Sequence, residues 1–419
     1  MQGPSTSGEK TILVHVNVFA TSSQEDLTEF EELARSAGAN PIITITVNCK
    51  TPTAKYFIGS GKAQEIQQFA AGTQATLILF NHELNAGQQR NLEQLCKCRI
   101  LDRTGLILDI FAQRARTFEG KLQVEIAQLQ YLSSRLIRGW THLERQKGGI
   151  GLRGPGETQL ETDRRLLRIR LKSLEKSLDK VLVQRNQSRR ARIKAEIPTL
   201  SLVGYTNAGK STLFNQLTDA KTYVANQLFA TLDPTLRRIE LSACGPLIIA
   251  DTVGFIRHLP HDLIAAFRAT LQETQEAWLL LHVIDAHNEL REDHIAQVNQ
   301  VLDEIGASNI SQLQIYNKID LLQDCSPHLE RDNQGRPMRV WLSAASGDGI
   351  NILKRAIAEL IGESFVYKEL TLKPTQSHLR AELYKKGAVV DEAIDHEGNY
   401  LLSIKLSKAD WDKFLRLLK

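Results

Sequence analysis

The segment Gly204–Ser211, GYTNAGKS, has the residue types and the spacing of a phosphate-binding loop. Glycines such as Gly204 and Gly209 let backbone N–H groups turn toward phosphate oxygens, where a side chain would block the approach. Lys210 would reach the β- and γ-phosphates, and the Ser211 hydroxyl would bind Mg²⁺. The apolar run TLSLV stands directly before the segment. The pattern therefore predicts a strand–loop–helix unit that binds a nucleoside triphosphate.

The base is indicated by two motifs further along the chain. The stretch LQIYNKID is an apolar strand that ends in Asn317-Lys318-x-Asp320. The Asp320 carboxylate can accept hydrogen bonds from N1–H and the 2-amino group of guanine, and adenine offers neither donor in that arrangement. Lys318 would lie over the ring, and the N–H groups of Ser343 and Ala344 in VWLSAAS would contact guanine O6. The predicted ligand is therefore GTP.

The γ-phosphate side of the site is predicted from two other stretches. In PLIIADTVGF, Asp251 would hold Mg²⁺ through water, and the N–H of Gly254 would meet the γ-phosphate. The stretch NQLFATLDPTLRR lies between the loop and Asp251, and a threonine in it is expected to bind Mg²⁺ and fold over the γ-phosphate. We predict Thr231 for this role, with Thr235 as the alternative.

These motifs define a predicted GTPase site, since their order along the chain is that of GTPases. Its catalytic residues are Lys210, Thr231 and Gly254, and its Mg²⁺ ligands are Ser211, Thr231 and Asp251. The residues predicted to contact the nucleotide are Gly204, Tyr205, Thr206, Asn207, Ala208, Gly209, Lys210, Ser211, Thr212, Phe229, Ala230, Thr231, Leu232, Asp233, Asp251, Thr252, Val253, Gly254, Asn317, Lys318, Ile319, Asp320, Ser343, Ala344 and Ala345.

Two residues set this site apart from that of many small GTPases. The residue after Asp-x-x-Gly is often a Gln that orients the attacking water, but here it is Phe255, followed by Ile256. Neither side chain forms hydrogen bonds, so hydrolysis is expected to be slow until a partner positions the water. Asn207 is either a ligand for a K⁺ ion beside the β/γ bridge or a residue that tolerates a turn. The first alternative predicts faster turnover in K⁺ than in Na⁺.

A glycine-rich stretch, KGGIGLRGPGETQLE, has five glycines within residues 148–156. It is either a flexible connector or a loop that enters a narrow, phosphate-lined space. Basic residues are dense around it, as in RNQSRRARIK, and aromatic residues are few, which favours recognition of folded RNA by shape and phosphate. The predicted RNA contacts are Lys147, Gly148, Gly149, Arg153, Gly154, Gly156, Arg164 and Arg165.

A second glycine–lysine stretch, YFIGSGKAQEI, contains Gly59-x-Gly61-Lys62. Its spacing is not that of a full phosphate loop, and no Ser or Thr follows the lysine. We interpret it as a strand-to-helix turn, with an ATP site as the alternative.

The elements that must position these residues are predicted from the apolar periodicity. Strand-like and helical stretches alternate from Thr11 to about Phe111, which favours a parallel α/β sheet. Apolar residues then recur every three and four positions in two stretches, which predicts an antiparallel hairpin of two helices. The seam of its second helix consists of Leu167, Leu171, Leu174, Leu178 and Val181.

We therefore predict an α/β multidomain protein with five regions. These are a disordered end or cloning remnant (1–10), an N-terminal parallel α/β domain (11–112), a helical hairpin with a glycine-rich tip (113–196, tip 148–156), a doubly wound P-loop GTPase domain (197–364) and a small C-terminal α+β module (365–419).

The composition excludes several other classes of protein. The five cysteines are odd in number and scattered, which suits reduced thiols better than a disulfide framework. Cys96-x-Cys98 has no second pair at metal-ligand spacing, so both are interpreted as core thiols. No apolar run reaches the roughly 18 residues of a membrane span, and the opening MQGPSTSGEK is no signal peptide. We expect a cytoplasmic, monomeric protein.

The chain resembles the HflX family of translation-factor-related GTPases over nearly its whole length. The resemblance is carried by YFIGSGKAQEI, LDRTGLILDIFAQRARTFEGKLQVEIAQLQY, GIGLRGPGETQLETDRR, GYTNAGKST, LFATLDPT, DTVGFI, NKID and QSHLRAELYKKG. The segment GPGETQLETDRR discriminates best, because GTPase motifs are shared across the whole superfamily.

The resemblance implies the large ribosomal subunit as the partner. Members of the family are described as placing the N-terminal domain and hairpin near the peptidyl-transferase region and as splitting stalled 70S ribosomes under stress. The glycine-rich tip would then contact ribosomal RNA, and the ribosome would compensate for Phe255. Members have also been credited with an N-terminal ATP site. Two alternatives remain: an assembly factor that uses GTP as a switch on immature large subunits, and a non-ribosomal regulator whose hairpin docks proteins.

Overall fold

The computed structural model consists of two compact units. The first unit comprises Met1–Val181, Ala225–Asp233 and Arg257–Arg268, and the second comprises Leu182–Val224, Pro234–Ile256 and Ala269–Lys419. The structure describes residues 9–18, 24–136, 159–194, 197–218, 228–241, 245–257, 268–362, 365–385, 388–395, 398–407, 411 and 414–415.

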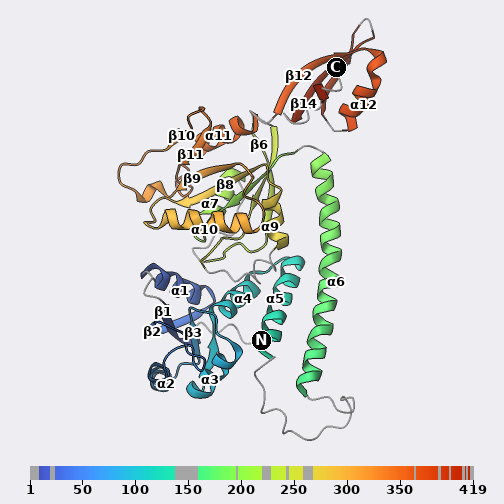
Figure 1. Cartoon of the computed structure of the whole chain (residues 1–419). Helices are drawn as coiled ribbons and strands as arrows, with labels where there is room; N and C mark the ends of the chain where they lie inside the picture. The colour runs from blue at the N-terminus through green and yellow to red at the C-terminus, as the bar shows by residue number, and fades with distance from the viewer. Residues whose placement is uncertain are drawn as a thin grey trace, which may run out of the picture. The chain divides into compact units, whose positions relative to one another are not determined.

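The first unit contains a four-stranded parallel sheet in the order β2-β1-β3-β4 (Figure 1). Helices α2 and α3 pack together, and the apolar side chains of α2 and α3 meet those of β1 and β3 in one core cluster. All four residues of β3 are buried, as expected for a parallel strand covered on both faces. The elements are β1 (Glu9–Val18), α1 (Gln24–Ser36), β2 (Ala39–Cys49), α2 (Ser60–Thr73), β3 (Leu77–Phe80), α3 (Ala86–Cys96), β4 (Arg99–Leu101) and α4 (Arg103–Arg114).

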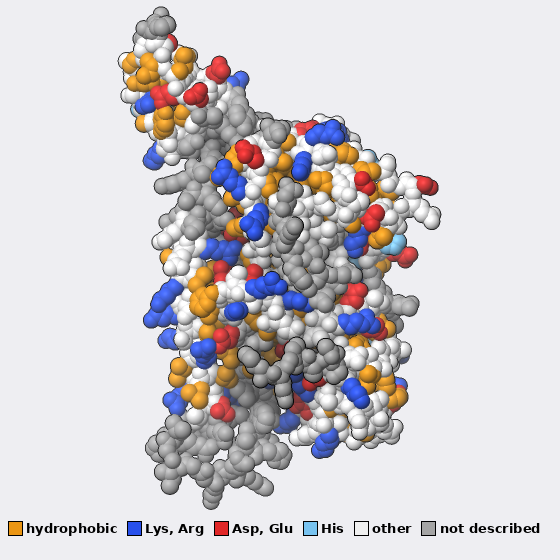
Figure 2. All heavy atoms as spheres, turned by 180° about the vertical axis from the view of Figure 1, so that it is seen from behind, with side chains coloured by type: hydrophobic (Ala, Val, Ile, Leu, Met, Phe, Trp, Pro, Cys, Tyr) orange, Lys and Arg blue, Asp and Glu red, His pale blue; other side chains and the backbone are white. Residues whose placement is uncertain are grey.

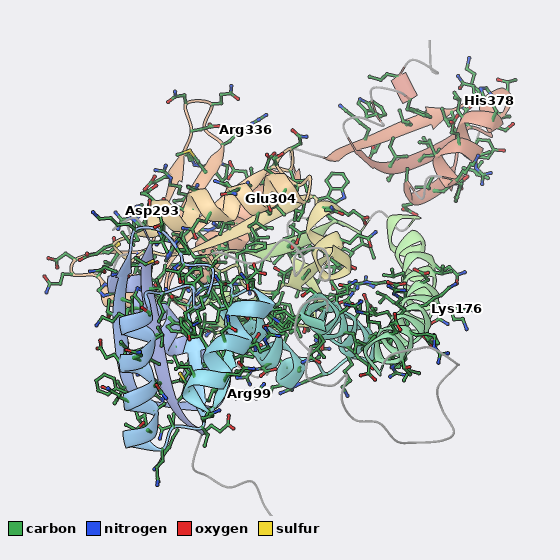
Figure 3. The ribbon with its side chains drawn as sticks, turned by 60° about the horizontal axis from the view of Figure 1, so that its bottom comes forward. Arg99, Lys176, Asp293, Glu304, Arg336 and His378 are labelled. Atoms are coloured by element: carbon green, nitrogen blue, oxygen red, sulfur yellow. The ribbon has the colours of Figure 1, made fainter. Side chains whose placement is uncertain are left out.

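Two long helices follow, α5 (Phe118–Leu136) and α6 (Gln159–Lys194). Their apolar seam contains Leu122, Ile126 and Leu174 as buried residues, with four further side chains packed against them. Four of the five seam positions predicted for the second helix lie in this cluster, at Leu171, Leu174, Leu178 and Val181. The opposite face of α6 is solvated: Lys176 is exposed (Figure 3), and basic side chains alternate with acidic and apolar ones along the helix (Figure 2).

The second unit contains a seven-stranded sheet in the order β10-β11-β9-β8-β5-β7-β6. Its inner strands are parallel, and β6 and β10 are antiparallel edge strands. The connection between β10 and β11 carries Arg336 (Figure 3). The elements are β5 (Thr199–Val203), α7 (Lys210–Thr218), β6 (Thr235–Leu241), β7 (Gly245–Asp251), α9 (Arg268–Gln275), β8 (Leu279–Asp285), α10 (Arg291–Glu304), β9 (Gln312–Asn317), η2 (Ile319–Leu321), β10 (His328–Arg331), β11 (Pro337–Trp341) and α11 (Ile350–Gly362).

The topology of this sheet explains where a ligand can bind. β5 lies between β7 and β8, and the crevice at the carboxyl ends of parallel strands is where doubly wound sheets bind ligands. The core beneath is apolar, since Leu200 and Leu202 of β5 pack with Leu213 and Phe214 of α7. The predicted doubly wound fold is therefore confirmed.

The C-terminal residues form a small α+β arrangement, as predicted. Three antiparallel strands, in the order β12-β14-β13, pack with α12 around Leu379, Leu383, Leu402 and Ile404. The elements are β12 (Phe365–Leu372), η3 (Pro374–Gln376), α12 (Ser377–Lys385), β13 (Val389–Ile394) and β14 (Tyr400–Ser407).

Candidate functional site: a nucleotide-binding loop and its partners

The predicted phosphate-binding loop connects β5 to α7. Gly204 has φ +146° and Gly209 has φ +94°, which side chains rarely allow. A Cβ on Gly204 would overlap the carbonyl oxygen of Val283, and one on Gly209 would overlap the side-chain amide of Asn317. Both glycines are therefore required by the loop conformation and by close neighbours. Asn207 takes φ +62°, a left-handed conformation that Asn tolerates better than most residues.

Lys210 lies at the start of α7 and is buried. Its Nζ donates to the carbonyl oxygens of Gly204 at 3.1 Å and Tyr205 at 2.7 Å, so the ammonium is held inside the loop. Burial lowers the pKa of Lys210 to about 8, and the nearby Asp251 carboxylate opposes that shift. Phosphate oxygens beside it would raise the pKa again and keep the side chain charged.

The two groups that suit a divalent cation are neighbours. Ser211 Oγ donates to Asp251 Oδ2 at 2.8 Å, and Asp251 is fully buried at the end of β7. A hydroxyl and a carboxylate are the oxygen ligands that Mg²⁺ prefers, so these residues fit the ion. Gly254 follows closely: a Cβ there would lie 3.0 Å from Lys210 Nζ. The backbone of the Asp-x-x-Gly motif therefore runs directly beside the loop lysine.

Phe255 joins this motif to the loop by backbone hydrogen bonds. Its N–H donates to the Gly204 carbonyl oxygen at 3.1 Å, and its carbonyl oxygen accepts from the N–H of Thr206 at 2.7 Å. The side chain is only 2% exposed, and Ile256 is also buried. Phe255 is thus a core residue at a position where many GTPases present a water-orienting amide.

The three segments of the predicted base site meet around Asn317. Its Nδ2 donates to the carbonyl oxygen of Ala208 at 2.9 Å, and its Oδ1 accepts from the N–H of Ala344 at 2.8 Å. The side chain therefore ties the Asn-Lys-x-Asp motif to both the phosphate loop and the Ser-Ala segment. Asp320 Oδ1 accepts from Ser343 Oγ at 2.5 Å, which orients the carboxylate predicted to recognise guanine.

Lys318 is fixed in the same region. It takes φ +66°, and its Nζ donates to Asp285 Oδ2 at 2.7 Å. Asp285 stands at the end of β8, the strand next to β9. This ion pair holds the aliphatic stem of Lys318 at the carboxyl edge of the sheet, and sequence reasoning did not identify Asp285.

A stacked pair of rings at the loop was also missed by sequence reasoning. The ring of Tyr205 lies 3.8 Å from that of His294 on α10, with an interplanar angle of 3°. Tyr205 is 8% exposed. The two residues lie almost ninety positions apart and on different elements. No local pattern in the sequence could therefore have paired them.

Residues 228–233, which include the predicted Thr231, belong to the first unit. Leu228, Phe229 and Leu232 are buried there, and Ala230, Thr231 and Asp233 are half-buried. Thr235, the alternative Mg²⁺ ligand, opens β6 and is paired with Asp251 across the sheet. It therefore has the regular backbone of a strand residue.

Only part of the predicted RNA-binding set falls within the described residues. Arg164 and Arg165 lie in the first turns of α6, half-buried and exposed, respectively. Lys147, Gly148, Gly149, Arg153, Gly154 and Gly156 lie outside the described residues. The alternative ATP stretch is the start of α2, where Lys62 pairs with Glu65 at 2.7 Å and a Cβ on Gly59 or Gly61 would meet nothing within 4 Å.

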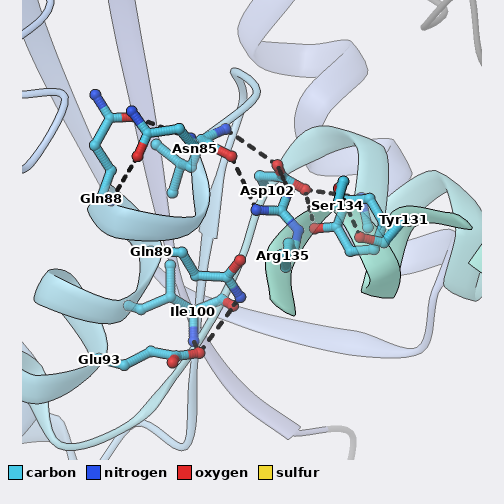
Figure 4. Close-up of polar contacts among 11 residues, drawn as sticks. Asn85, Gln88, Gln89, Glu93, Ile100, Asp102, Tyr131, Ser134 and Arg135 are labelled. Carbon is cyan, nitrogen blue, oxygen red and sulfur yellow. Dashed lines mark hydrogen bonds and ion pairs between the residues drawn. The ribbon is translucent and has the colours of Figure 1, made fainter. Parts of the chain in front are cut away.

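One arginine, Arg135 in the last turn of α5, faces inward. Arg135 Nη2 donates to Asp102 Oδ2 at 2.5 Å, and the guanidinium lies over the ring of Tyr131 (Figure 4). Asp102 is fully buried and also accepts from Tyr131 Oη at 2.6 Å and from the N–H groups of Leu84 and Gly105. Burial raises the pKa of Tyr131, and the neighbouring Asp102 carboxylate raises it further. This cluster fastens α5 to the sheet and borders a cavity of about 390 Å³.

Comparisons with known proteins agree with this geometry. Three family models match successive parts of the chain: GTP-binding GTPase N-terminal (24–112), GTP-binding GTPase Middle Region (114–192) and 50S ribosome-binding GTPase (199–318). GTPase HflX of Escherichia coli (strain K12) is 55% identical over 98% of this chain and 96% of its own length. GTPase HflX of Caldanaerobacter subterraneus subsp. tengcongensis is 44% identical over 93% of this chain and 89% of its own length.

The chain belongs to the HflX family of GTPases. The predicted HflX resemblance is thereby confirmed. Among solved structures, the crystal structure of SsGBP and GDP complex aligns with a TM-score of 0.49 at 24% identity, over 84% of this chain and 99% of that one. Within the described residues, no helix is long and apolar enough to cross a membrane.

As an HflX GTPase, the chain hydrolyses GTP. P-loop GTPases generally use Mg²⁺, which neutralises charge on the β- and γ-phosphates. Within the chain, Lys210 is buried in the loop and Asn317 is hydrogen-bonded to the loop backbone, so the groups that would position a nucleotide are held in place before it binds. Because Phe255 is buried, its side chain does not orient the attacking water.

Proposed function

We propose that this protein binds the large ribosomal subunit through its N-terminal α/β region and helical hairpin, and that it separates stalled ribosomes into subunits. The match to a 50S ribosome-binding GTPase model over residues 199–318 is the observation that carries this proposal. We further propose that the protein is a cytoplasmic monomer and that it acts near the peptidyl-transferase region. The proposed domains of the protein are residues 11–112, 113–196, 197–364 and 365–419.

At the nucleotide, Lys210 is proposed to hold the phosphates, and the N–H of Gly254 to donate to the γ-phosphate. Ser211, Thr231 and Asp251 are proposed as Mg²⁺ ligands. The contact to guanine O6 is assigned to the N–H of Ala345, because those of Ser343 and Ala344 already donate to Asp348 and Asn317.

The hairpin is proposed to contact ribosomal RNA by charge and shape. Exposed Arg165 and the glycine-rich tip at 148–156 would supply these contacts. Arg135 is left out of this set because it is bound to Asp102 inside the protein.

GTP turnover with and without purified large subunits tests the proposal most directly. We expect a low basal rate, since Phe255 cannot orient water, and a rate at least about a hundredfold higher with large subunits. An equal rate would contradict ribosomal stimulation. Sedimentation of 70S particles with a non-hydrolysable GTP analogue then separates the roles: splitting supports the proposal, whereas binding to immature large subunits alone favours the assembly factor.

The monovalent cation at Asn207 is a separate proposal. The left-handed backbone at this residue suits either a turn or an oxygen ligand aimed at the phosphates. Turnover measured in K⁺ is expected to exceed that in Na⁺, and Asn207→Ala is expected to abolish the difference. Equal rates in both salts would remove the cation site.

A further inference from the structure

The chain leaves the second unit at two places, and both are segments that report on the γ-phosphate in GTPases. The first, Ala225–Asp233, contains Thr231 and lies between α7 and β6. The second begins at Arg257, two residues after Phe255. Both segments are grouped with the first unit, because their contacts lie mainly there.

Asp233 is bound by the start of α5. Its Oδ2 accepts from the backbone N–H groups of Arg116 and Thr117, both at 2.8 Å, and its Oδ1 accepts from Thr117 Oγ1 at 2.5 Å. Unpaired N–H groups and the positive end of the helix dipole favour a carboxylate at this place. The three hydrogen bonds join residues more than a hundred positions apart.

The receptor is shaped for this carboxylate. A Cβ on Gly120 would overlap Asp233 Oδ1, so the first turn of α5 is open only because residue 120 is glycine. Thr117 already caps the helix, since its Oγ1 accepts from the N–H of Gly120 at 2.9 Å. Asp233 is therefore not needed merely to begin α5.

A second anchor stands on the other side of Thr231. Phe229 is 2% exposed, and its ring meets that of Phe111 edge-on at 4.8 Å. Its φ of +56° is a strained value for a bulky residue, which persists only when the surroundings fix it. Leu228 adds a hydrogen bond from its N–H to Ser36 Oγ at 3.2 Å.

Arg257, which follows the Asp-x-x-Gly motif, is bound within the same unit. Its Nη1 donates to Asp26 Oδ1 at 2.7 Å, and its carbonyl oxygen accepts from Arg103 Nη2 at 2.8 Å. Arg103 is buried and pairs with Glu29 at 2.6 Å. The last residue of the first segment, Asp233, and the first residue of the second, Arg257, thus both form polar contacts within the first unit.

We infer that Asp233 is a positioning residue for GTP hydrolysis, because its carboxylate, held by the first turn of α5, orders the segment that brings Thr231 to the γ-phosphate. Thr231 has a fixed residue two positions away on each side, so less conformational entropy remains to be lost when it binds. By linkage, GTP strengthens the grip of Asp233 on α5 to the same degree. The inference rests on the proposed role of Thr231, and needs no ribosome.

Four variants test it through the affinities for a non-hydrolysable GTP analogue and for GDP, both with Mg²⁺. Asp233→Ala removes the carboxylate, and Gly120→Ala closes its receptor without touching the segment. Each is expected to weaken the analogue about tenfold and GDP less than about twofold. The double variant is expected to bind the analogue no more weakly than Asp233→Ala does, since both substitutions remove the same contact between Asp233 and α5. Gly72→Ala, where a Cβ meets nothing within 4 Å in helix α2, is the matched control.

Asp233→Asn provides the conservative variant. One amide oxygen can still accept from the N–H groups of Arg116 and Thr117, so an analogue affinity between those of the wild type and Asp233→Ala is expected. Amide hydrogen exchange of Arg116 and Thr117 gives a second readout: the analogue should slow it in the wild type and leave it unchanged in Asp233→Ala.

Three results would overturn the inference. Equal losses for GDP and the analogue would assign Asp233 a structural role. A wild-type affinity in Gly120→Ala would show that the contact with α5 is not the cause. Tighter analogue binding in Asp233→Ala would mean that docking opposes GTP. Since these measurements use the full chain and nucleotide alone, they remain valid if the ribosomal proposal fails.

Discussion

The phosphate loop and the Thr231 segment are both predicted parts of the GTPase site, but different contacts hold them. The loop is fixed by hydrogen bonds within the second unit, from Lys210, Asn317 and Phe255 to its own backbone. The Thr231 segment takes its described contacts from the first unit. The loop therefore keeps its shape through contacts in its own unit, whereas the position of the Thr231 segment depends on residues of the first unit.

The largest loss is expected from Lys210→Ala. The buried ammonium is the loop's positive charge for the β- and γ-phosphates, and losing such a group typically costs about a thousandfold in rate. Single-turnover GTP hydrolysis by the large-subunit-stimulated protein measures it. A loss below about tenfold would mean that another cation does this work and that the loop is less self-contained than the structure indicates.

A pH effect is expected from His282, which lies in β8 beside β5 and is 1% exposed. Burial lowers its pKa from 6.5 to about 4, and a hydrogen bond with the Gln312 side chain opposes that shift. Because the folded pKa lies below the unfolded one, its contribution to stability is complete above about pH 6.5 and is lost as the pH falls toward 4, at up to about 3 kcal/mol.

The free energy of unfolding of the wild type and of His282→Gln, measured from pH 7 to pH 4, checks this effect. The difference between the two proteins should shrink or reverse as the pH falls. A difference that stays constant would show that His282 does not titrate in this range and that the strand beside the loop is insensitive to acid.

Base recognition should change with Asp320→Asn. The carboxylate loses its match to the N1–H and 2-amino donors of guanine, so affinity for GTP is expected to fall about a hundredfold and affinity for XTP to rise. Competition binding with both nucleotides measures the ratio. An unchanged preference for GTP over XTP would refute the assignment of base recognition to Asp320. The hydrogen bond from Ser343 would then only hold the carboxylate in place.

The smallest effect is expected at Arg257, which follows the Asp-x-x-Gly motif. Arg257→Ala removes an ion pair to Asp26 that is partly exposed, with about a fifth of each side chain accessible. Such pairs contribute little, so a twofold to threefold loss of GTP-analogue affinity is expected, with GDP unaffected. A loss as large as that of Asp233→Ala would mean that the two anchors act as one unit.

The sequence predicted the second unit more completely than it predicted the contacts of the Thr231 segment. The order of GYTNAGKS, DTVGF, NKID and SAAS required strands that end at one edge of a sheet, and the structure places them there. Long-range partners escaped prediction: Tyr205 with His294, Lys318 with Asp285, and Arg135 with Asp102. None has a local spacing signal, because tertiary packing alone brings these residues together.

The sequence by itself determined the nucleotide loop, since its glycines, lysine and hydroxyl are defined by local backbone geometry and by the chemistry of phosphate. It also predicted the alternation of strands and helices and the apolar seam between α5 and α6. Only the tertiary structure decided where the Thr231 segment rests. The acceptor Asp233 and the N–H donors at Arg116 and Thr117 are ordinary residues in the sequence, and their meaning depends on two distant chain segments meeting.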